Sequence, residues 1–296
     1  MNNQPLVSIV AVCYNHAQFV VETLDSIKAQ TYPNIELLIL DDCSSDDSVA
    51  VIKGWIKCSD YDCTFIAHQE NQGICKTFNE GIRLVSGDYY QVLACDDVLL
   101  LDKIRLQVNC FLTNKDLTLV HSASCKINDR SEVIEELFVL NSYNKQGVQN
   151  DFEEMISLVV AGNIVIAPSV LIKTESLPPQ PVYPEKFFFE DLYLILFFLT
   201  NRKIFYYIEE PLVKYRELET SVMRSTKHKA KLKSDRNKIL LEFLGYSEKI
   251  DKKILRKAKN NITTSDLISF FIKKRLSIRN ILYSLRQKAI FKAFEM

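Results

Sequence analysis

The chain has 296 residues, of which 47% are hydrophobic, and equal numbers of acidic and basic residues give it a formal net charge of zero. This composition predicts a globular protein with a sizeable core and excludes an intrinsically disordered chain. The eight cysteines contain no Cys-x-x-Cys pair, which argues against a zinc module or a disulfide framework and favours reduced thiols.

Apolar alternation and helical spacing take turns along the first hundred residues. Strands are predicted at residues 6–13, 35–40, 63–67 and 89–94, and helices at 17–30, 48–57 and 75–85. Such alternation predicts an α/β fold with a mostly parallel central sheet flanked by helices.

The order of elements changes after residue 97. The pattern there predicts helices at 103–112 and 190–200, strands at 117–126, 164–173 and 203–208, and a proline-rich loop at 178–184. The last ~70 residues have helical spacing throughout and predict a C-terminal helical appendage. We therefore divide the chain into a domain at residues 1–225, with halves at 1–99 and 100–225, and a helical region at 226–296.

Targeting segments and several common site motifs are missing from the sequence. The N-terminus has no basic region followed by an apolar core, and the longest apolar run, residues 192–199, is far shorter than the ~20 residues that span a bilayer. We therefore expect a cytoplasmic protein. The seven glycines form no Gly-x-Gly-x-x-Gly, P-loop or Gly-x-Ser-x-Gly motif, which disfavours dehydrogenases, P-loop NTPases and serine hydrolases.

Two pairs of aspartates directly follow predicted strands. Asp41 and Asp42 follow the second strand, and Asp96 and Asp97 follow the fourth. Ligands of open parallel sheets bind beyond the carboxyl ends of the strands, so both pairs are expected at one ligand site. Mg²⁺ and Mn²⁺ take one or two carboxylates together with substrate phosphates, which predicts a nucleotide-diphosphate site. The alternative for Asp96 or Asp97 is capping of a helix that begins near residue 101.

Several motifs in fixed order resemble the family 2 inverting glycosyltransferases of the GT-A fold, of the type that acts in bacterial surface-polysaccharide synthesis. The resemblance is detailed over residues 5 to about 115 and looser to about 221. The motifs lie at residues 8–15, 30–36, 41–46, 71–73 with 79–81, and 87–90 with 96–97.

The resemblance implies roles for residues of the donor site. Tyr14 would stack on the nucleotide base, and Asp41 or Asp42 would accept hydrogen bonds from the base or the ribose. An aromatic face tolerates any base and contributes ~1–3 kcal/mol, while a carboxylate needs only donors. Asp97 would coordinate Mn²⁺ or Mg²⁺, assisted by Asp96 through the ribose or a metal-bound water. The alternative for Tyr14 is an ordinary core aromatic.

The resemblance departs from the family pattern at two positions. Ala94 stands where the first aspartate of the fuller acidic motif often lies, so metal binding would depend on fewer carboxylates. Leu218 stands where a histidine is common, so phosphate contacts would fall to Arg216, with Lys76 or Lys214 as possible helpers. The alternative for Arg216 is a solvated surface charge.

A third acidic pair, Glu190 with Asp191, resembles the motif that supplies the family's catalytic base. Inverting transfer requires a base because the acceptor hydroxyl must lose its proton as it attacks the anomeric carbon. Asp191 is the expected base, and its alternative is a helix-start carboxylate that interacts with the helix dipole.

The predicted function is hexose transfer from a nucleotide-diphosphate sugar, most simply a UDP-sugar, to a saccharide acceptor. From the resemblance the acceptor is expected to be lipid-linked, in O-antigen, capsule or other surface-polysaccharide synthesis. No nucleic acid partner is expected. A sugar-nucleotide pyrophosphorylase is disfavoured because no glycine-rich loop follows Val12, and a non-catalytic binding subunit because all three acidic pairs are intact.

The C-terminal region is strongly basic. Residues 226–296 contain 19 of the 37 Lys and Arg residues but only 6 of the 37 Asp and Glu residues. A basic amphipathic helix in this region predicts peripheral docking on an anionic membrane surface. The alternative is that its apolar face packs on protein while the charges face water.

Overall fold

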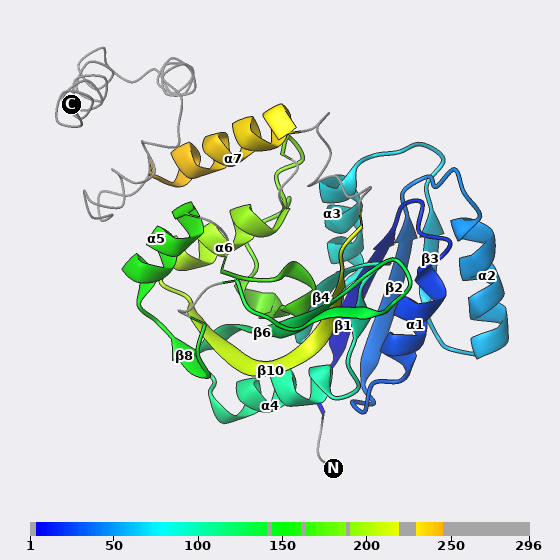
Figure 1. Cartoon of the computed structure of the whole chain (residues 1–296), viewed down its shortest axis with the longest axis horizontal. Coiled ribbons are helices and arrows are strands. Elements are labelled where there is room, and N and C mark those ends of the chain that lie inside the picture. Colours follow the sequence, from blue (N-terminus) through cyan, green and yellow to red (C-terminus); the bar gives the residue numbers. More distant parts are fainter. Residues whose placement is uncertain (1–3, 141–143, 162–163, 188–189, 219–228, 245–296) are drawn as a thin grey trace.

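The computed structural model describes residues 4–140, 144–161, 164–187, 190–218 and 229–244 (Figure 1). One sheet of ten strands forms the centre of the molecule, and helices cover both of its faces. The predicted α/β fold is therefore confirmed.

The first half of the chain alternates strands and helices as predicted. The strands β1, β2, β3 and β4 pair in parallel in the order β3-β2-β1-β4. The elements are β1 (Val7–Cys13), α1 (Val20–Lys28), β2 (Ile35–Asp41), α2 (Ser48–Ser59), β3 (Thr64–Ala67), α3 (Ile74–Leu84) and β4 (Tyr89–Ala94).

The second half continues the same sheet in the order β4-β9-β6-β10-β5. Here antiparallel pairs are common, so the predicted parallel pairing describes mainly the first half. The elements are β5 (Val98–Leu99), α4 (Lys103–Thr113), β6 (Leu117–Ile127), β7 (Val133–Phe138), β8 (Gly147–Gln149), α5 (Phe152–Ala161), β9 (Leu171–Lys173), α6 (Glu190–Thr200) and β10 (Ile204–Arg216).

Prolines explain two differences from the predicted strands. The strand expected at residues 164–173 is reduced to β9, because Pro168 lies in a 3₁₀ turn, Ala167–Ser169, and has no N–H for a sheet. The strand expected to end at residue 208 continues to Arg216, and irregular register with β6 on both sides of Pro211 accommodates that proline.

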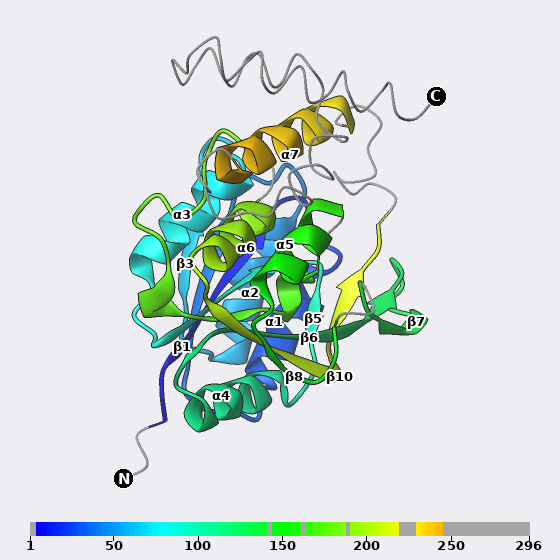
Figure 2. The same ribbon diagram turned by 90° about the vertical axis from the view of Figure 1, so that its left-hand side faces the viewer.

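The sheet is buried on both faces, which explains why its first strands are almost wholly apolar. Helices α1, α2 and α4 cover one face, α3, α5 and α6 cover the other, and α7 (Lys229–Leu244) packs outside α6 (Figure 2). In β1, Ile9 faces the first layer and Val10 the second, as the period of two requires.

The sheet runs without interruption through the predicted division at residues 99 and 100. The predicted boundary at residue 225 lies outside the described residues, as does the appendage beyond α7. No helix within the described part of the chain has both the length and the apolar character needed to cross a membrane.

Candidate active site

The carboxyl ends of β1, β2 and β4 bring the sequence-predicted donor residues to one edge of the sheet. Cys13 of β1 is in register with Asp41 of β2, and Val12 is in register with Ala94 of β4. The residues that follow these strands therefore emerge side by side, as expected for the acidic pairs. Tyr14, which follows β1, is 48% exposed, so it is not a core aromatic and its ring is open to stacking.

The first acidic pair is buried and hydrogen-bonded within the chain. Asp41 accepts hydrogen bonds from the backbone N–H and the hydroxyl of Ser44 at 2.8 and 2.6 Å. Asp42 accepts from His68 Nδ1 at 2.9 Å and from the backbone N–H groups of Gln72 and Gly73 at 2.8 Å each. Both carboxylates thus fix the loops at this edge, and a contact with a base or ribose would come from an oxygen already held in place.

Hydrogen bonds join the loops that follow β1 and β2, and the sequence did not predict them. Asn15 accepts from the backbone of Ser45 at 2.7 Å and donates its own N–H to Ser44 Oγ at 2.8 Å, while Asp46 accepts from the backbone of Ala17 at 3.0 Å. Asn15 has a φ of 57°, in the left-handed region that asparagine tolerates. In the sequence, the asparagine directly after Tyr14 was the one indication of a turn at this point.

The second acidic pair has fewer partners. Asp96 is 18% exposed and faces His16 Nε2 at 3.8 Å. Asp97 is buried, and its Oδ1 accepts one hydrogen bond, from the backbone N–H of Arg216 at 2.9 Å. Burial, and then the neighbouring charge of Asp96, hold the pKa of Asp97 well above its usual range, although Arg216 acts in the opposite direction.

The structure argues against the interpretation that Asp96 or Asp97 caps a helix. The residue that precedes α4 at its N-cap position is Asp102, so neither Asp96 nor Asp97 caps that helix. A buried carboxylate whose charged form is disfavoured is stabilised by a nearby cation. The hard oxygen atoms of Asp96 and Asp97 suit Mn²⁺ or Mg²⁺, with the remaining ligands supplied by phosphate and water.

The protein itself offers few ligands for such an ion. No group of three or more His, Cys, Asp or Glu side chains within the described ranges has the arrangement of a metal site. Binding through two carboxylates therefore fits an ion that arrives with a diphosphate, as expected from Ala94 in place of an acidic residue.

Arg216 is buried rather than solvated, which rules out the surface-charge interpretation. Its guanidinium donates to Glu22 at 2.6 Å, to the carbonyl of Asn128 at 2.8 Å, to Ser131 Oγ at 3.0 Å and to the carbonyl of Asp96 at 2.7 Å. The side chain thus joins α1, the turn at Asp96 and the β6–β7 turn. The expected phosphate contact stays a prediction, because these partners occupy four of the five guanidinium N–H groups.

Asp191 lies at the start of α6, where its Oδ1 accepts the backbone N–H of Leu192 at 2.6 Å. Tyr215 of β10 is influenced both by Asp191 and by the second acidic pair. Burial, and then the negative charges of Asp97, Asp96 and Asp191, raise the pKa of the Tyr215 hydroxyl. The charges of the candidate base and of the candidate metal ligands therefore all act on one phenol, although 94 positions separate Asp97 from Asp191 in the sequence.

Comparison with known proteins identifies the family of the chain. Residues 8–171 match the model of the family described as glycosyl transferase family 2. The chain belongs to this family. An uncharacterized glycosyltransferase of Rickettsia typhi is 31% identical over 171 residues, which cover 57% of this chain and 52% of the relative. The family 2 chain thus spans about half the length of the curated relatives it matches.

Two solved structures share the fold. S. aureus TarS residues 1–349 in complex with UDP-GlcNAc superposes with a TM-score of 0.61 at 15% identity, covering 88% of this chain and 80% of TarS. The mannosyltransferase PcManGT from Pyrobaculum calidifontis, in complex with GDP-Man and Mn²⁺, gives 0.57 at 17% identity, covering 99% and 81%. At these identities the likeness confirms the expected GT-A type of fold.

Proposed function

We propose that this family 2 glycosyltransferase is an inverting, metal-dependent enzyme that transfers a hexose from a nucleotide-diphosphate sugar to a saccharide acceptor. The observation that carries the proposal is that the charges of Asp96, Asp97 and Asp191 all act on the Tyr215 hydroxyl, which raises its pKa together with burial. Two carboxylates that suit a cation and a third that can accept a proton thus lie within electrostatic reach of one phenol.

In the proposed reaction the acceptor hydroxyl attacks the anomeric carbon from the face opposite the diphosphate. Asp191 accepts the hydroxyl proton, the new glycosidic bond forms, and the bond to the diphosphate breaks. Mn²⁺ or Mg²⁺ held by Asp97 and Asp96 would supply positive charge to the departing diphosphate. Arg216 keeps the Asp96 turn in position through its bond to the Asp96 carbonyl.

The proposed donor is a UDP-sugar. The exposed ring of Tyr14 accepts either a pyrimidine or a purine, so stacking alone does not choose the base. The fold neighbours were solved with UDP-GlcNAc and with GDP-Man, and both nucleotides therefore belong in a test of the donor.

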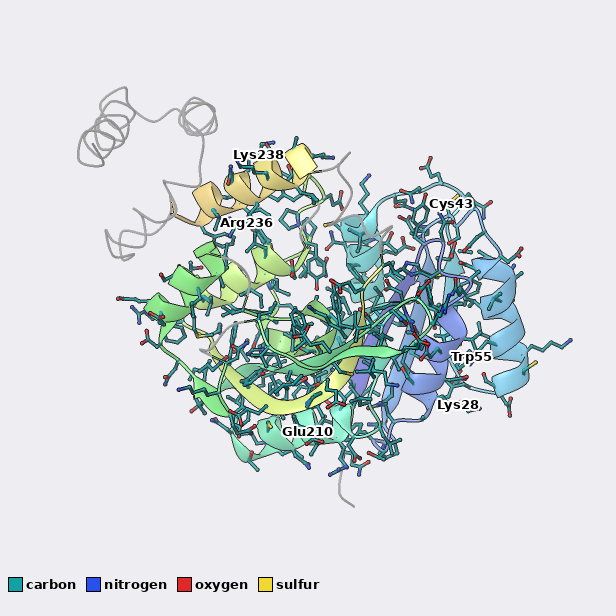
Figure 3. The ribbon with its side chains drawn as sticks, viewed as in Figure 1. Lys28, Cys43, Trp55, Glu210, Arg236 and Lys238 are labelled. Carbon is teal, nitrogen blue, oxygen red and sulfur yellow. The ribbon has the colours of Figure 1, made fainter. Side chains whose placement is uncertain are left out.

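The proposed acceptor is a lipid-linked saccharide of surface-polysaccharide synthesis, met at the inner face of the plasma membrane. In α7 the apolar side chains of Leu232, Ile239 and Leu240 are buried, and the last two belong to the core cluster that includes α6. Lys233 and Lys238 are exposed on the same helix. Figure 3 labels Lys238 there. For α7 the packing alternative thus accounts for the apolar face, and membrane attraction would act through the charges.

The donor is tested by thermal unfolding with a panel of UDP- and GDP-sugars in the presence of Mn²⁺. A ligand at ~100 times its Kd stabilises the folded state by ~2.7 kcal/mol, which is a clear shift of the midpoint. Transfer to a saccharide acceptor then separates an enzyme from a non-catalytic binding subunit. Absence of stabilisation by every sugar nucleotide would contradict the proposed function.

Membrane docking is tested by sedimentation with vesicles that contain or lack phosphatidylglycerol. We expect the full chain to pellet with anionic vesicles at low salt and a chain ending at Arg224 to stay in solution. Equal pelleting of the two proteins, or binding that ignores lipid charge and salt, would leave the C-terminal region as a packing element.

A further inference from the structure

The imidazole of His68 is held between two carboxylates beside the donor site. His68 follows β3, and its side chain is only 4% exposed. Its Nδ1 lies 2.9 Å from Oδ1 of Asp42, and its Nε2 lies 3.1 Å from Oε2 of Glu80. None of the roles described above uses this ring.

The two contacts require a particular protonation state. An ionised carboxylate only accepts hydrogen bonds, and a neutral imidazole donates from one nitrogen only. Both contacts are hydrogen bonds to carboxylates when the ring is an imidazolium that donates from both nitrogens. In the neutral ring one nitrogen lone pair would face a carboxylate oxygen at about 3 Å, in a buried setting where such repulsion is poorly screened.

The ring connects the end of β2 with two places on α3. Asp42 also accepts the backbone N–H groups of Gln72 and Gly73, which precede the first turn of α3, and its carbonyl accepts from the Asn71 amide at 3.0 Å. Glu80 lies farther along the same helix. His68 therefore fixes both the start and the body of α3 against Asp42 (Figure 1 shows β2, β3 and α3 as neighbours).

This arrangement borders the predicted nucleotide contacts. The backbone N–H of Asp42 donates to the carbonyl of Cys13, the residue before Tyr14, at 2.9 Å. The loop at residues 71–73 is thus attached through Asp42 to the strand that presents the exposed ring of Tyr14. A shift of Asp42 would move the edge of the sheet on which the base is expected to lie.

We propose that His68 is a positioning residue of the donor site, whose protonated ring holds Asp42 and the loop at residues 71–73 in their binding arrangement. This inference rests on the proposed function, because it concerns the nucleotide of the same donor. The charged groups that face the ring are Asp42 from the end of β2 and Glu80 from α3, while the backbone N–H of His68 donates to the Asp41 carbonyl at 2.9 Å.

The direction of the pH dependence follows from these contacts. At low pH the ring donates to both carboxylates and the loop is held. As pH rises and the ring loses its proton, one hydrogen bond is lost and the two negative charges are no longer bridged. Donor affinity should therefore fall as the ring loses its proton with rising pH.

The test compares wild type with Glu80→Gln by calorimetric titration of UDP-GlcNAc and GDP-mannose at fixed Mg²⁺ between about pH 5.5 and 8.5. A glutamine amide accepts a hydrogen bond from the charged ring and donates one to the neutral ring, so both protonation states are satisfied. We expect wild-type Kd to rise about tenfold with pH, as for the loss of one charge-assisted hydrogen bond, and Kd of the variant to stay nearly constant. Any contribution of the donor phosphates or of Asp97 to the pH dependence of Kd is the same in wild type and in Glu80→Gln.

Several results would overturn the inference. An equal pH dependence of Kd in wild type and Glu80→Gln would contradict it. If the role of His68 were purely structural, Glu80→Gln would have a lower melting temperature but the same pH dependence of Kd as wild type. In wild type, the ring ¹⁵N resonances of His68 report its protonation directly, and loss of the proton without a change in Kd would also contradict it. Failure of both nucleotides to bind at any pH would remove the proposed function together with this inference.

Discussion

The two acidic pairs at the ends of β2 and β4 have the same residues in the same relation to a strand, yet the chain surrounds them differently. Asp41 and Asp42 accept hydrogen bonds from a hydroxyl, an imidazole and three backbone N–H groups. Within the described residues Asp97 accepts a single backbone N–H, and Asp96 lies 3.8 Å from His16 Nε2.

The donors around a buried carboxylate decide what it can do. The first pair is stabilised by the chain itself, so it can fix loops whether or not a ligand is bound. The second pair has little internal compensation, and the pKa of Asp97 is raised by burial and by Asp96. Arg216 offsets these effects only in part, so the positive charge of a metal ion would stabilise the second pair, which supports the division of labour proposed above.

The largest effect is expected from Asp97→Asn, which removes a charge but keeps the shape of the side chain. Donor binding that depends on Mn²⁺ should disappear and turnover should fall below detection, because the charge that holds the ion is lost. Equilibrium dialysis of Mn²⁺ with the donor, together with a transfer assay, measures both. Unchanged turnover in the variant, or full activity of wild type in EDTA, would remove the metal role.

The next effect is expected from Asp191→Asn. The variant keeps its size but loses the proton acceptor, so transfer should fall by the ~10²–10⁴-fold typical of general-base loss while the donor Kd is maintained. Glu175→Gln, which removes an exposed carboxylate, is the matched control and should behave as wild type. Loss of donor affinity with normal transfer from bound donor would make Asp191 a binding residue.

Asp42→Asn tests the first acidic pair, whose carboxylates are expected to fix loops. The new amide cannot accept from all three donors now bonded to Asp42, and a buried donor left without a partner destabilises a fold by about 1–3 kcal/mol. We expect a melting temperature lower by about 2–4 °C for each kcal/mol in a protein of this size, with the metal requirement retained. Loss of the metal requirement without loss of stability would show that the two pairs do not differ as described.

The sequence predicts those site residues whose position follows from the local alternation of strands and helices. Strands in the first half are apolar runs that end in aspartates, and their parallel pairing brings Asp41 and Asp97 to one edge without further information. The sequence could not distinguish the two pairs, because the donors that surround Asp42 come from loops whose conformation depends on the finished sheet.

Features that depend on distant residues were missed. The ion pair between Arg216 and Glu22 joins residues 194 positions apart, so the sequence left Arg216 open between a phosphate contact and a surface charge. The strand β7 was not predicted because Val133, Ile134 and Leu137 are exposed at more than half of their surface on both of its sides, which erases the alternation of a half-buried strand.

The smallest predicted effect is a pH dependence of stability in metal-free protein. The pKa of Asp97 is raised in the folded state, first by burial and then by the charge of Asp96. An unfolded aspartate ionises near pH 3.9, so the contribution of Asp97 to stability is complete below that pH and is lost as pH rises through the folded pKa. Asn in its place cannot ionise. The melting temperature of Asp97→Asn should therefore equal that of wild type near pH 4 and exceed it by a few degrees at pH 8.

The same measurement separates the two pairs. Mn²⁺ with a sugar nucleotide should restore stability to wild type at pH 8 but leave Asp97→Asn unchanged, since binding to the folded state stabilises only a protein with the site. Asp41→Asn should be less stable than wild type at pH 8, because its carboxylate accepts two hydrogen bonds from Ser44. A difference between Asp97→Asn and wild type that is the same at every pH would show that the buried charge of Asp97 is already compensated within the chain.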